Sequence, residues 1–534
     1  MRFLLPLICV STLGLAAEAA EVSIIPKPVS ATVTEGTFTL APDTVILTDA
    51  ATRQVGEMLA RSLAPATGWT MPVRRGKAKD NGVALVIDRG LARLGEEGYT
   101  LEVTPKRVII RAPKPGGVFY GTQSFRQLLP PAIFASSVQK GVSWDVPCLK
   151  VEDHPRFVWR GALVDVGRHF MPKEWLLKFI DLIAMQKINT LQVHLTDDQG
   201  WRIEIKKYPK LTEIGSKRKQ TRLGHENRST EFDGKSHGGY FTQQDIREIV
   251  AYARERFVNV VPEIEMPGHA TAAIAAYPEL GSTGKQLEVG TYWGVYKSIF
   301  SPSERTILFL QDVLGELLEL FPSRFIHVGG DEAPKDEWKA SAQVQARIKE
   351  LGLKDEAEMQ SYFIRRMDQF LTSRGRRLIG WDEILEGGLA PGATVMSWRG
   401  TEGGIAAAKA GHDVVMTPTD YLYLDYYQSK DPQEPLSIGG FVPLEKVYAY
   451  EPVPAELTPE QGKRVLGAQG NLWTEYIRTT QHLEYMAFPR LAAVAEMTWT
   501  PKESKDLASF KERLKAQEER WRALGVNFRP LGKP

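Results

Sequence analysis

Cysteine and excess charge are both scarce in this sequence. Two cysteines occur among 534 residues, too few for a scaffold held together by disulfides. The formal net charge is +2, so no strong field is available to attract nucleic acid or an anionic membrane. The nine histidines are scattered, with no His-Glu-x-x-His motif and no Cys-x-x-Cys pair. We therefore expect no metal site, no nucleic-acid partner and no nucleotide, flavin or pyridoxal cofactor.

Long apolar runs are also lacking, apart from one at the N-terminus. Residues 3–17 are largely apolar and follow a basic residue, and residues 17–19 have the small-x-small pattern of a cleavage site. The run is shorter than the roughly 20 apolar residues that span a bilayer, which argues against stable membrane insertion. A signal peptide over residues 1–19 would remove Cys9 and leave one cysteine without an intrachain partner. We expect a secreted or periplasmic bacterial protein.

The chain is too long for one compact core, so two or three domains are expected. Residues 20–152 contain short β-rich runs separated by glycine and proline, with strands at 83–87 and 107–111 and a helix beginning within 116–129. This mixture predicts a small α+β accessory domain. It carries no obvious catalytic cluster.

From residue 153 to residue 500 strands and helices alternate. The apolar strand candidates cover residues 159–166, 189–195, 258–264, 325–328, 377–379, 394–396, 414–416 and 465–468. Helical patterns lie at residues 173–186, 243–256, 303–320, 357–374, 401–409 and 481–497. Eight strands with crossover helices predict an α/β fold, an enlarged (β/α)8 barrel. A doubly wound open sheet is the alternative, but its Gly-rich phosphate fingerprint is absent.

Two further segments complete the organisation. Residues 501–534 predict a terminal helical segment that packs on the barrel. Residues 216–239 are polar and rich in glycine and basic residues, which predicts a long loop. Loops of that length in a compact domain are usually functional or disordered.

The polar residues of chemical interest share one position, just past the C-terminal end of a predicted strand. In a barrel these strand ends form one rim and converge on one site. The group comprises Arg168, Asp197, Glu265, His269, Asp331, Glu332, Trp381, Trp398, Tyr423, Asp425, Trp473 and Glu475. Any one of these motifs alone could be structural, and their convergence is what indicates function.

Asp331 and Glu332 follow the fourth predicted strand, after two glycines that let the backbone approach a ligand closely. Two adjacent carboxylates in a poorly solvated site should not both ionise easily, so their proton affinities should split. One anionic and one protonated carboxyl group suit glycoside cleavage. The alternative is a helix N-cap, in which both acids favour the dipole of the next helix.

These motifs, in this order, resemble glycoside hydrolase family 20, the β-N-acetylhexosaminidases, from about residue 25 to residue 499. The resemblance implies an exo-acting retaining enzyme in which the substrate's own 2-acetamido oxygen is the nucleophile, an exception among glycosidases. By matching motif, Glu332 would be the general acid and base. Asp331 would orient the acetamido N–H and stabilise the charge that develops on it.

The resemblance assigns the other rim residues to supporting and binding roles. Asp197 and His269 would tune and position Glu332, and Tyr423 would donate to the acetamido oxygen. A forked contact of Arg168 with the sugar hydroxyls is implied as well. Trp381, Trp398 and Trp473 would enclose the sugar with their aromatic rings. Asp425 and Glu475 would accept hydrogen bonds from sugar hydroxyls.

Several points stay open. Glu265 stands where many family members carry aspartate, and its extra methylene is either absorbed by a small backbone shift or alters how His269 is held. Trp201 and Trp293 lie in predicted rim loops and are either second-sugar contacts or ordinary packing. A conventional double-displacement glycosidase, a disaccharide-releasing relative and a non-catalytic carbohydrate-binding barrel remain as alternatives. The expected partner is an N-acetylhexosamine-terminated glycan, the sugar's identity is open, and the chain could be a monomer or a homodimer.

Overall fold

The N-terminal part of the computed structural model, which describes residues 22–533, is an α+β domain, as predicted. Its seven-stranded mixed sheet has the order β1-β7-β5-β6-β4-β2-β3. Along β5 Tyr99, Leu101 and Val103 are buried while the residues between them are half-buried, so one sheet face meets the helices. The elements are β1 (Ser30–Thr39), β2 (Val45–Thr48), α1 (Arg53–Thr67), β3 (Val73–Arg75), β4 (Gly82–Ile87), η1 (Arg89–Leu94), β5 (Tyr99–Thr104), β6 (Arg107–Ala112), α2 (Pro115–Leu128), η2 (Pro131–Phe134) and β7 (Asp145–Asp153).

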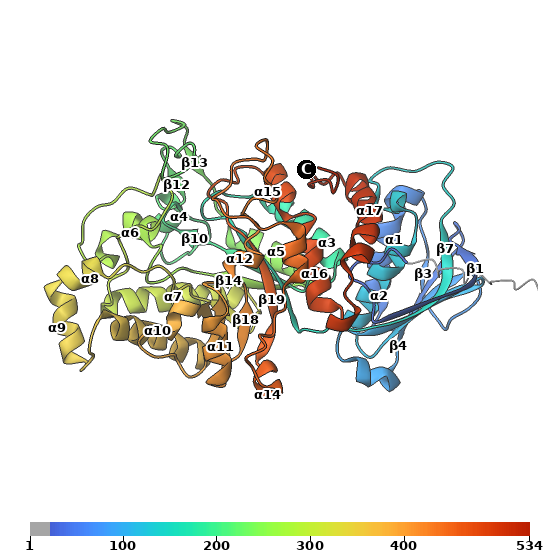
Figure 1. The fold of residues 1–534 in the computed structure, drawn as a ribbon, viewed down its shortest axis with the longest axis horizontal. Helices are drawn as coiled ribbons and strands as arrows, with labels where there is room; N and C mark the ends of the chain where they lie inside the picture. Colours follow the sequence, from blue (N-terminus) through green and yellow to red (C-terminus); the bar gives the residue numbers. More distant parts are fainter. Residues whose placement is uncertain (1–21, 534) are drawn as a thin grey trace, which may run out of the picture.

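The second part is a closed barrel of eight parallel strands, which confirms the predicted barrel and all eight predicted strands (Figure 1). β8 and β9 are buried at every position, as expected for strands covered by side chains inside and helices outside. The strands are β8 (Trp159–Asp165), β9 (Thr190–His194), β14 (Asn259–Glu263), β15 (Phe325–His327), β16 (Arg377–Trp381), β17 (Thr394–Ser397), β18 (Val414–Met416) and β19 (Val465–Leu472).

Crossover helices surround the barrel at most connections, with one exception: only the short η4 (Asp382–Leu385) lies between β16 and β17. The main helices are α3 (Lys173–Met185), α5 (Gln243–Glu255), α7 (Glu304–Leu320), α10 (Glu356–Thr372) and α11 (Glu402–Lys409). Shorter ones are α4 (Lys210–Glu213), α6 (Thr271–Ala276), η3 (Pro278–Leu280), α8 (Asp336–Ala340), α9 (Ala342–Glu350), α12 (Thr419–Leu422), α13 (Leu444–Ala449), α14 (Pro459–Gly462) and η5 (Lys502–Ser504).

The single helix predicted over residues 481–497 is wrong, because two helices occupy that segment. They are α15 (Thr480–Ala487) and α16 (Arg490–Trp499). Pro489 lies between them and has no backbone N–H, so it cannot continue the hydrogen-bonding pattern of α15.

The terminal helix α17 (Leu507–Ala523) touches both parts of the molecule. Arg513 pairs with Glu496 of α16 at 2.6 Å, and Arg520 donates to the carbonyl oxygen of Gln127 at 2.7 Å. A buried ion pair between Lys187 and Asp153 (2.8 Å) also joins the barrel to the N-terminal sheet. The two parts are therefore tied by polar contacts as well as by packing.

The long polar loop predicted at residues 216–239 is irregular, except for a short ladder between β12 (Lys217–Arg218) and β13 (His237–Gly238). The buried Arg218 anchors it to the rim by donating to the carbonyl oxygen of Arg168 at 2.6 Å. The remaining two-residue strands are β10 (Thr196–Asp197) and β11 (Gly200–Trp201). They follow β9 in the chain and pair with each other. None of the helices within residues 22–533 has the length and apolar character needed to cross a bilayer.

Candidate active site

A strained turn after β15 presents Asp331 and Glu332. Gly329, Gly330 and Glu332 all have positive φ angles, of 66°, 102° and 44°. A side chain on Gly329 would overlap with the carboxylate of Glu265, which packs against it. For a non-glycine residue such as Glu332 this backbone conformation is costly and is typical of functional sites. The next helix, α8, begins at Asp336 and has Lys335 at its N-cap, so the helix-cap interpretation of Asp331 and Glu332 is wrong.

His269 connects the two acids to the buried side of the site. Its Nε2 atom lies 3.5 Å from Oδ2 of Asp331 and 3.5 Å from Oε2 of Glu332. Its Nδ1 atom lies 3.4 Å from Asp197 and 3.3 Å from Asp198. Burial lowers the pKa of His269, but the surrounding carboxylates, Asp197 first, raise it well above its usual value. An imidazolium therefore faces both acids.

Asp197 is the central anion beneath this histidine. Arg168 pairs with it at 2.9 Å, and Nε2 of His194 lies 3.1 Å away. Burial raises the pKa of Asp197, but the charges of Arg168 and His269 hold it below its ordinary value. The ionised carboxylate thus fixes both Arg168 and His269.

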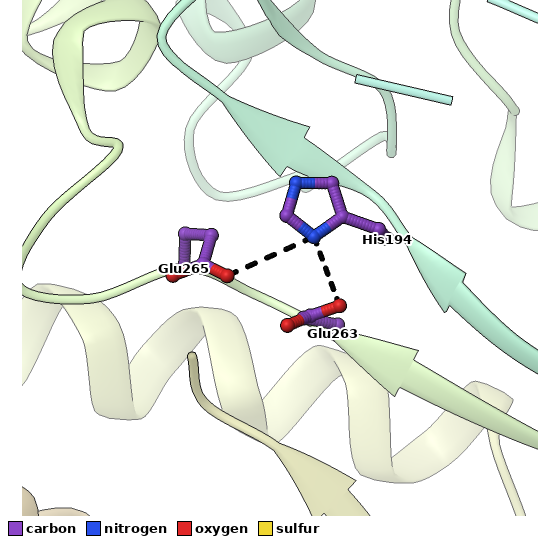
Figure 2. A group of neighbouring side chains, drawn as sticks. All are labelled: His194, Glu263 and Glu265. Carbon is purple, nitrogen blue, oxygen red and sulfur yellow. Dashed lines mark ion pairs between the residues drawn. The ribbon is translucent and has the colours of Figure 1, made fainter. Parts of the chain in front are cut away.

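Below the rim lies a buried layer of two glutamates and two histidines, part of which is drawn in Figure 2. The Nδ1 atom of His194 is 2.9 Å from Glu263 and 3.7 Å from Glu265. Glu263 also faces Nδ1 of His327 at 2.9 Å and accepts from the indole N–H of Trp381 at 2.9 Å. Burial lowers the pKa of His194, but Glu263 and Asp197 raise it to about 10.

The pKa values of the two glutamates of this layer are shifted in opposite directions. Burial raises the pKa of Glu263, but His327 and His194 bring it well below its usual range. The pKa of Glu265 is raised well above its usual range by burial and by the charges of Asp331 and Glu263. His194, Glu263 and Glu265 bring ligand atoms within 4.8 Å of one another, as a metal site would. Protein contacts already occupy Glu263, whereas both carboxylate oxygens of Glu265 are buried without a hydrogen-bond partner within residues 22–533.

Four aromatic rings form a continuous wall at the rim. Trp381 and Trp473 have ring centroids 5.7 Å apart, and Tyr423 lies 6.1 Å from both Trp473 and Trp398. The guanidinium of Arg168 lies over Trp473 at 5.1 Å. The structure thus brings together all three predicted tryptophans with Tyr423 and Arg168.

Several buried oxygens near this wall have no hydrogen-bond partner within residues 22–533. They are both carboxylate oxygens of Asp425, Oε2 of Glu475 and Oδ1 of Asp331. Burial and the charge of Glu475 raise the pKa of Asp425 well above its usual range. Burial raises the pKa of Glu475 to about 6, even though Arg168 acts to lower it. Unpaired buried oxygens are costly, so this arrangement suits a ligand rich in hydroxyl groups.

Several residues of the site had no role in the sequence-based prediction, among them His194, His327, Glu263 and Glu383. Glu263 is the last residue of β14 and contacts two histidines and Trp381. A carboxylate inside an otherwise apolar strand is the sequence feature that could have indicated its role. Glu383 accepts from the indole N–H of Trp398 at 2.9 Å. Burial and the charge of Asp331 raise its pKa to about 8. It belongs to the strand-end motif that supplied Trp381, and adjacency alone could have indicated it.

The two tryptophans left open between sugar contact and packing are packed. Trp201 is 1% exposed and donates its indole N–H to the carbonyl oxygen of Ile203 at 2.8 Å. Trp293 is 4% exposed, between His169 and the guanidinium of Arg218. Neither presents a face to a second sugar.

Comparison with known proteins agrees with this geometry. The chain matches the catalytic-domain model of glycosyl hydrolase family 20 over residues 157–502 and the family's domain 2 model over residues 21–154. It is 46% identical, over 95% of its length, to a β-hexosaminidase of Porphyromonas gingivalis, and it spans 64% of that protein. It is 36% identical to a β-hexosaminidase of Vibrio furnissii, over 90% of this chain and 77% of that one.

Solved structures give the same result. The GH20 β-N-acetylhexosaminidase of Streptomyces coelicolor has 34% identity and a TM-score of 0.83, covering 96% of this chain and 98% of that one. A Streptomyces plicatus β-hexosaminidase mutant in complex with the product GlcNAc also has 34% identity and a TM-score of 0.83, over 96% of this chain and 97% of that one. With a two-part fold, a rim of paired carboxylates and both family models matched, the chain belongs to glycosyl hydrolase family 20.

Proposed function

We propose that this protein is an exo-acting, retaining β-N-acetylhexosaminidase that uses substrate-assisted catalysis. The observation that carries the proposal is the arrangement of Asp331 and Glu332, each with an oxygen 3.5 Å from the same nitrogen of His269. Their side chains differ in accessibility: 14% of Asp331 and 39% of Glu332 is exposed. The more exposed carboxyl group suits proton exchange with a leaving group and with water, and the enclosed one suits a fixed contact.

In the first step Glu332 donates a proton to the glycosidic oxygen as the bond from that oxygen to C1 breaks. The carbonyl oxygen of the substrate's 2-acetamido group attacks C1 from the opposite face and forms an oxazolinium ring. Asp331 accepts a hydrogen bond from the acetamido N–H and stabilises its growing positive charge. The hydroxyl of Tyr423 donates to the acetamido oxygen and so positions the nucleophile.

In the second step the now ionised Glu332 takes a proton from water, whose oxygen attacks C1 and reopens the ring. Two inversions at C1 retain the anomeric configuration. His269, whose Nε2 lies 3.5 Å from Glu332, positions this carboxyl group for both proton transfers. Asp197 in turn favours the imidazolium form of this histidine.

The other rim residues bind the terminal sugar. Trp381, Trp398 and Trp473 enclose the acetamido methyl and the sugar face, and apolar contact with C–H groups favours such stacking. The unpaired oxygens of Asp425 and Glu475 accept from sugar hydroxyls. Arg168 is already held by Asp197, its buried Nε has no hydrogen-bond partner within residues 22–533, and its guanidinium serves a forked contact with the sugar hydroxyls.

Loops close the rim on the side next to Glu475. A site closed in this way favours a terminal sugar over the middle of a chain, which supports exo action. The backbone N–H of Glu226 donates to the hydroxyl of Tyr476 at 3.1 Å, and His225 stacks on that ring. A Vibrio harveyi relative is named an exo β-N-acetylglucosaminidase, with 31% identity over 96% of this chain. Another relative from the same organism is named N,N'-diacetylchitobiase. Both names fit removal of one terminal sugar.

The test is a glycan panel with analysis of the released sugar. We expect aryl β-N-acetylglucosaminides and β-N-acetylgalactosaminides to yield the free monosaccharide, with inhibition by an oxazoline-mimicking thiazoline. Release of a disaccharide from an aryl chitobioside would instead show the disaccharide-releasing alternative.

We further propose export through residues 1–19, supported by their basic start, apolar run and small-x-small ending. Mass spectrometry of the protein from a native bacterial host should show an N-terminus near residue 20. A mature protein that retains residues 1–19 would contradict this proposal.

A further inference from the structure

A cavity of about 470 Å³ lies between the N-terminal domain and the barrel, away from the strand-end rim. Its lining comes from α1, α2 and η2 on one side, and from α3, the end of α5 and the end of α17 on the other. In Figure 1 the α2 and α17 helices lie between the barrel and the N-terminal sheet. The volume falls in the range of about 300–1,000 Å³ that is usual for small-molecule sites.

The guanidinium of Arg126 is the main charged group in this cavity that a ligand can contact. Its Nε atom is buried and has no hydrogen-bond partner within residues 22–533. Its Nη1 atom donates to the neutral amide oxygen of Gln123, at 3.1 Å. The guanidinium lies over the ring of Phe134 at 4.6 Å. Burial lowers the pKa of Arg126 to about 10, so it remains a cation at neutral pH.

The one acid in the lining is already occupied. Asp181 accepts hydrogen bonds from Nε of Arg256 and from the hydroxyl of Tyr252, the latter at 2.6 Å. The charged lining residues are Arg61, Arg126, Asp181 and Arg256, three cations against one anion, for a net charge of +2. Arg61 and Asp181 are exposed to solvent, but Arg126 is half-buried with a buried Nε, and a cation partly withdrawn from water without a matched carboxylate is unfavourable. The charge balance of the cavity therefore favours an anionic ligand.

The rest of the wall is largely apolar. It is formed by Met58, Leu59, Pro65, Phe119, Phe134, Leu182, Ala184, Met185 and Leu524. A hydrated inorganic anion would leave this surface uncovered, whereas an apolar body of five or so carbons would cover it. The planar fork of a guanidinium matches the two oxygens of a carboxylate.

We propose that this interdomain cavity is a binding site for a small amphiphilic carboxylate, whose charged end pairs with Arg126 and whose apolar body lies against Phe119, Phe134 and Met185. Such a ligand would contact both domains. By binding only the folded chain, it would stabilise the protein.

The probe is hexanoate, titrated into the full chain by isothermal calorimetry. Two control ligands are hexan-1-ol, which lacks the carboxylate, and acetate, which lacks the long apolar chain. We expect one hexanoate site per chain, with at least tenfold weaker binding of both hexan-1-ol and acetate. Arg126→Met keeps the stem and removes the charge, and should weaken hexanoate binding at least tenfold. Arg53→Met, on the exposed side of α1, is the matched control and should bind as the unchanged protein does.

A second variant keeps the proposal testable if Arg126→Met does not fold. Ser62→Phe should fill the cavity from α1 and abolish hexanoate binding, while Arg126 stays in place. Hexanoate binding no tighter than that of hexan-1-ol or acetate, or unaffected by both variants, would overturn the proposal. So would the absence of any binding of hexanoate at millimolar concentration.

Discussion

The carboxylate of Glu265 packs directly against the Cα atom of Gly329, where a side chain would have to stand. Gly329 opens the turn that presents Asp331 and Glu332, and its φ angle is 66°. A residue of the buried layer therefore packs against the turn that carries Asp331 and Glu332. Glycine is needed at position 329 for two separate reasons: the backbone is left-handed, and there is no room for a side chain.

Gly329→Ala should lower both stability and activity. The left-handed backbone costs an alanine about 1 kcal/mol, and displacing the buried Glu265 adds about 1–3 kcal/mol more. Because the displaced turn carries Glu332, kcat should fall together with the melting temperature. Denaturant unfolding and steady-state kinetics measure the two effects.

Gly352→Ala is the matched control for this substitution. Gly352 has the same φ of 66° but nothing within 4 Å of a Cβ atom built on it. It should show only the backbone cost of about 1 kcal/mol, with unchanged kcat. Equal destabilisation by the two variants would mean that the contact with Glu265 is unimportant.

The buried layer yields a second prediction, because its two glutamates differ in protonation. Glu265 is held neutral, so Glu265→Gln, of the same shape and charge, should keep kcat/KM within about threefold. Glu263 is held ionised beside His194 and His327, so Glu263→Gln should cost about 3–5 kcal/mol of stability. Glu265→Gln should also leave the stability nearly unchanged, so steady-state kinetics and chemical unfolding of both variants are the measurements. Comparable losses in the two would contradict the assigned charges.

Glu383 gives a prediction about pH. Its pKa is raised to about 8 by burial, by Asp331 and by Asp382, from an ordinary value of 4.5. Between these pH values the unfolded chain loses the proton that the folded chain keeps, so the contribution of Glu383 to stability falls as pH rises. It is fully present below about pH 4.5 and lost as pH passes about 8.

Glu383→Gln keeps an acceptor for the indole N–H of Trp398 and removes this titration. The melting temperature of the unchanged protein should therefore fall relative to that of the variant between about pH 5 and pH 8. Differential scanning calorimetry at a series of pH values gives the difference. A constant difference across that window would show that Glu383 does not titrate there.

Glu332 and Asp331 should respond differently to the leaving group. Glu332→Gln removes the proton donor, so kcat should fall about 10²–10⁴-fold on chitobiose but much less on an aryl glycoside with an acidic phenol. Asp331→Asn removes the stabilisation of the acetamido group, so its loss should be similar on both substrates. Kinetics on the two substrates test this division. An equal leaving-group dependence of the two variants would contradict it.

The barrel could be predicted from sequence because apolar strands and strand-end polar motifs recur in order, and a closed barrel brings all those ends to one rim. Periodicity did not separate α15 from α16, since the apolar positions of both helices read as one continuous pattern and only Pro489 marks the break. It also gave no indication that α17 contacts the N-terminal domain. That contact depends on how the two parts dock.

The carboxylate pair was predicted, but the means of holding it was not. The positive φ angles of His269 and Glu332 have no sequence signature, because left-handed backbone at these residue types is imposed by the surrounding fold. The roles of Glu263 and Glu265 depend on which histidine each one faces, a long-range contact that local pattern does not encode.

The most direct test of the account compares two substrates that differ only at C2. An aryl 2-acetamido-2-deoxy-β-glucoside carries the proposed nucleophile, and the matching aryl β-glucoside carries a hydroxyl there. We expect kcat/KM to be lower for the glucoside by at least about 10³-fold, since the acetamido oxygen supplies an intramolecular nucleophile. Comparable turnover of the two substrates, with a glycosyl group trapped on an enzyme carboxylate, would contradict it.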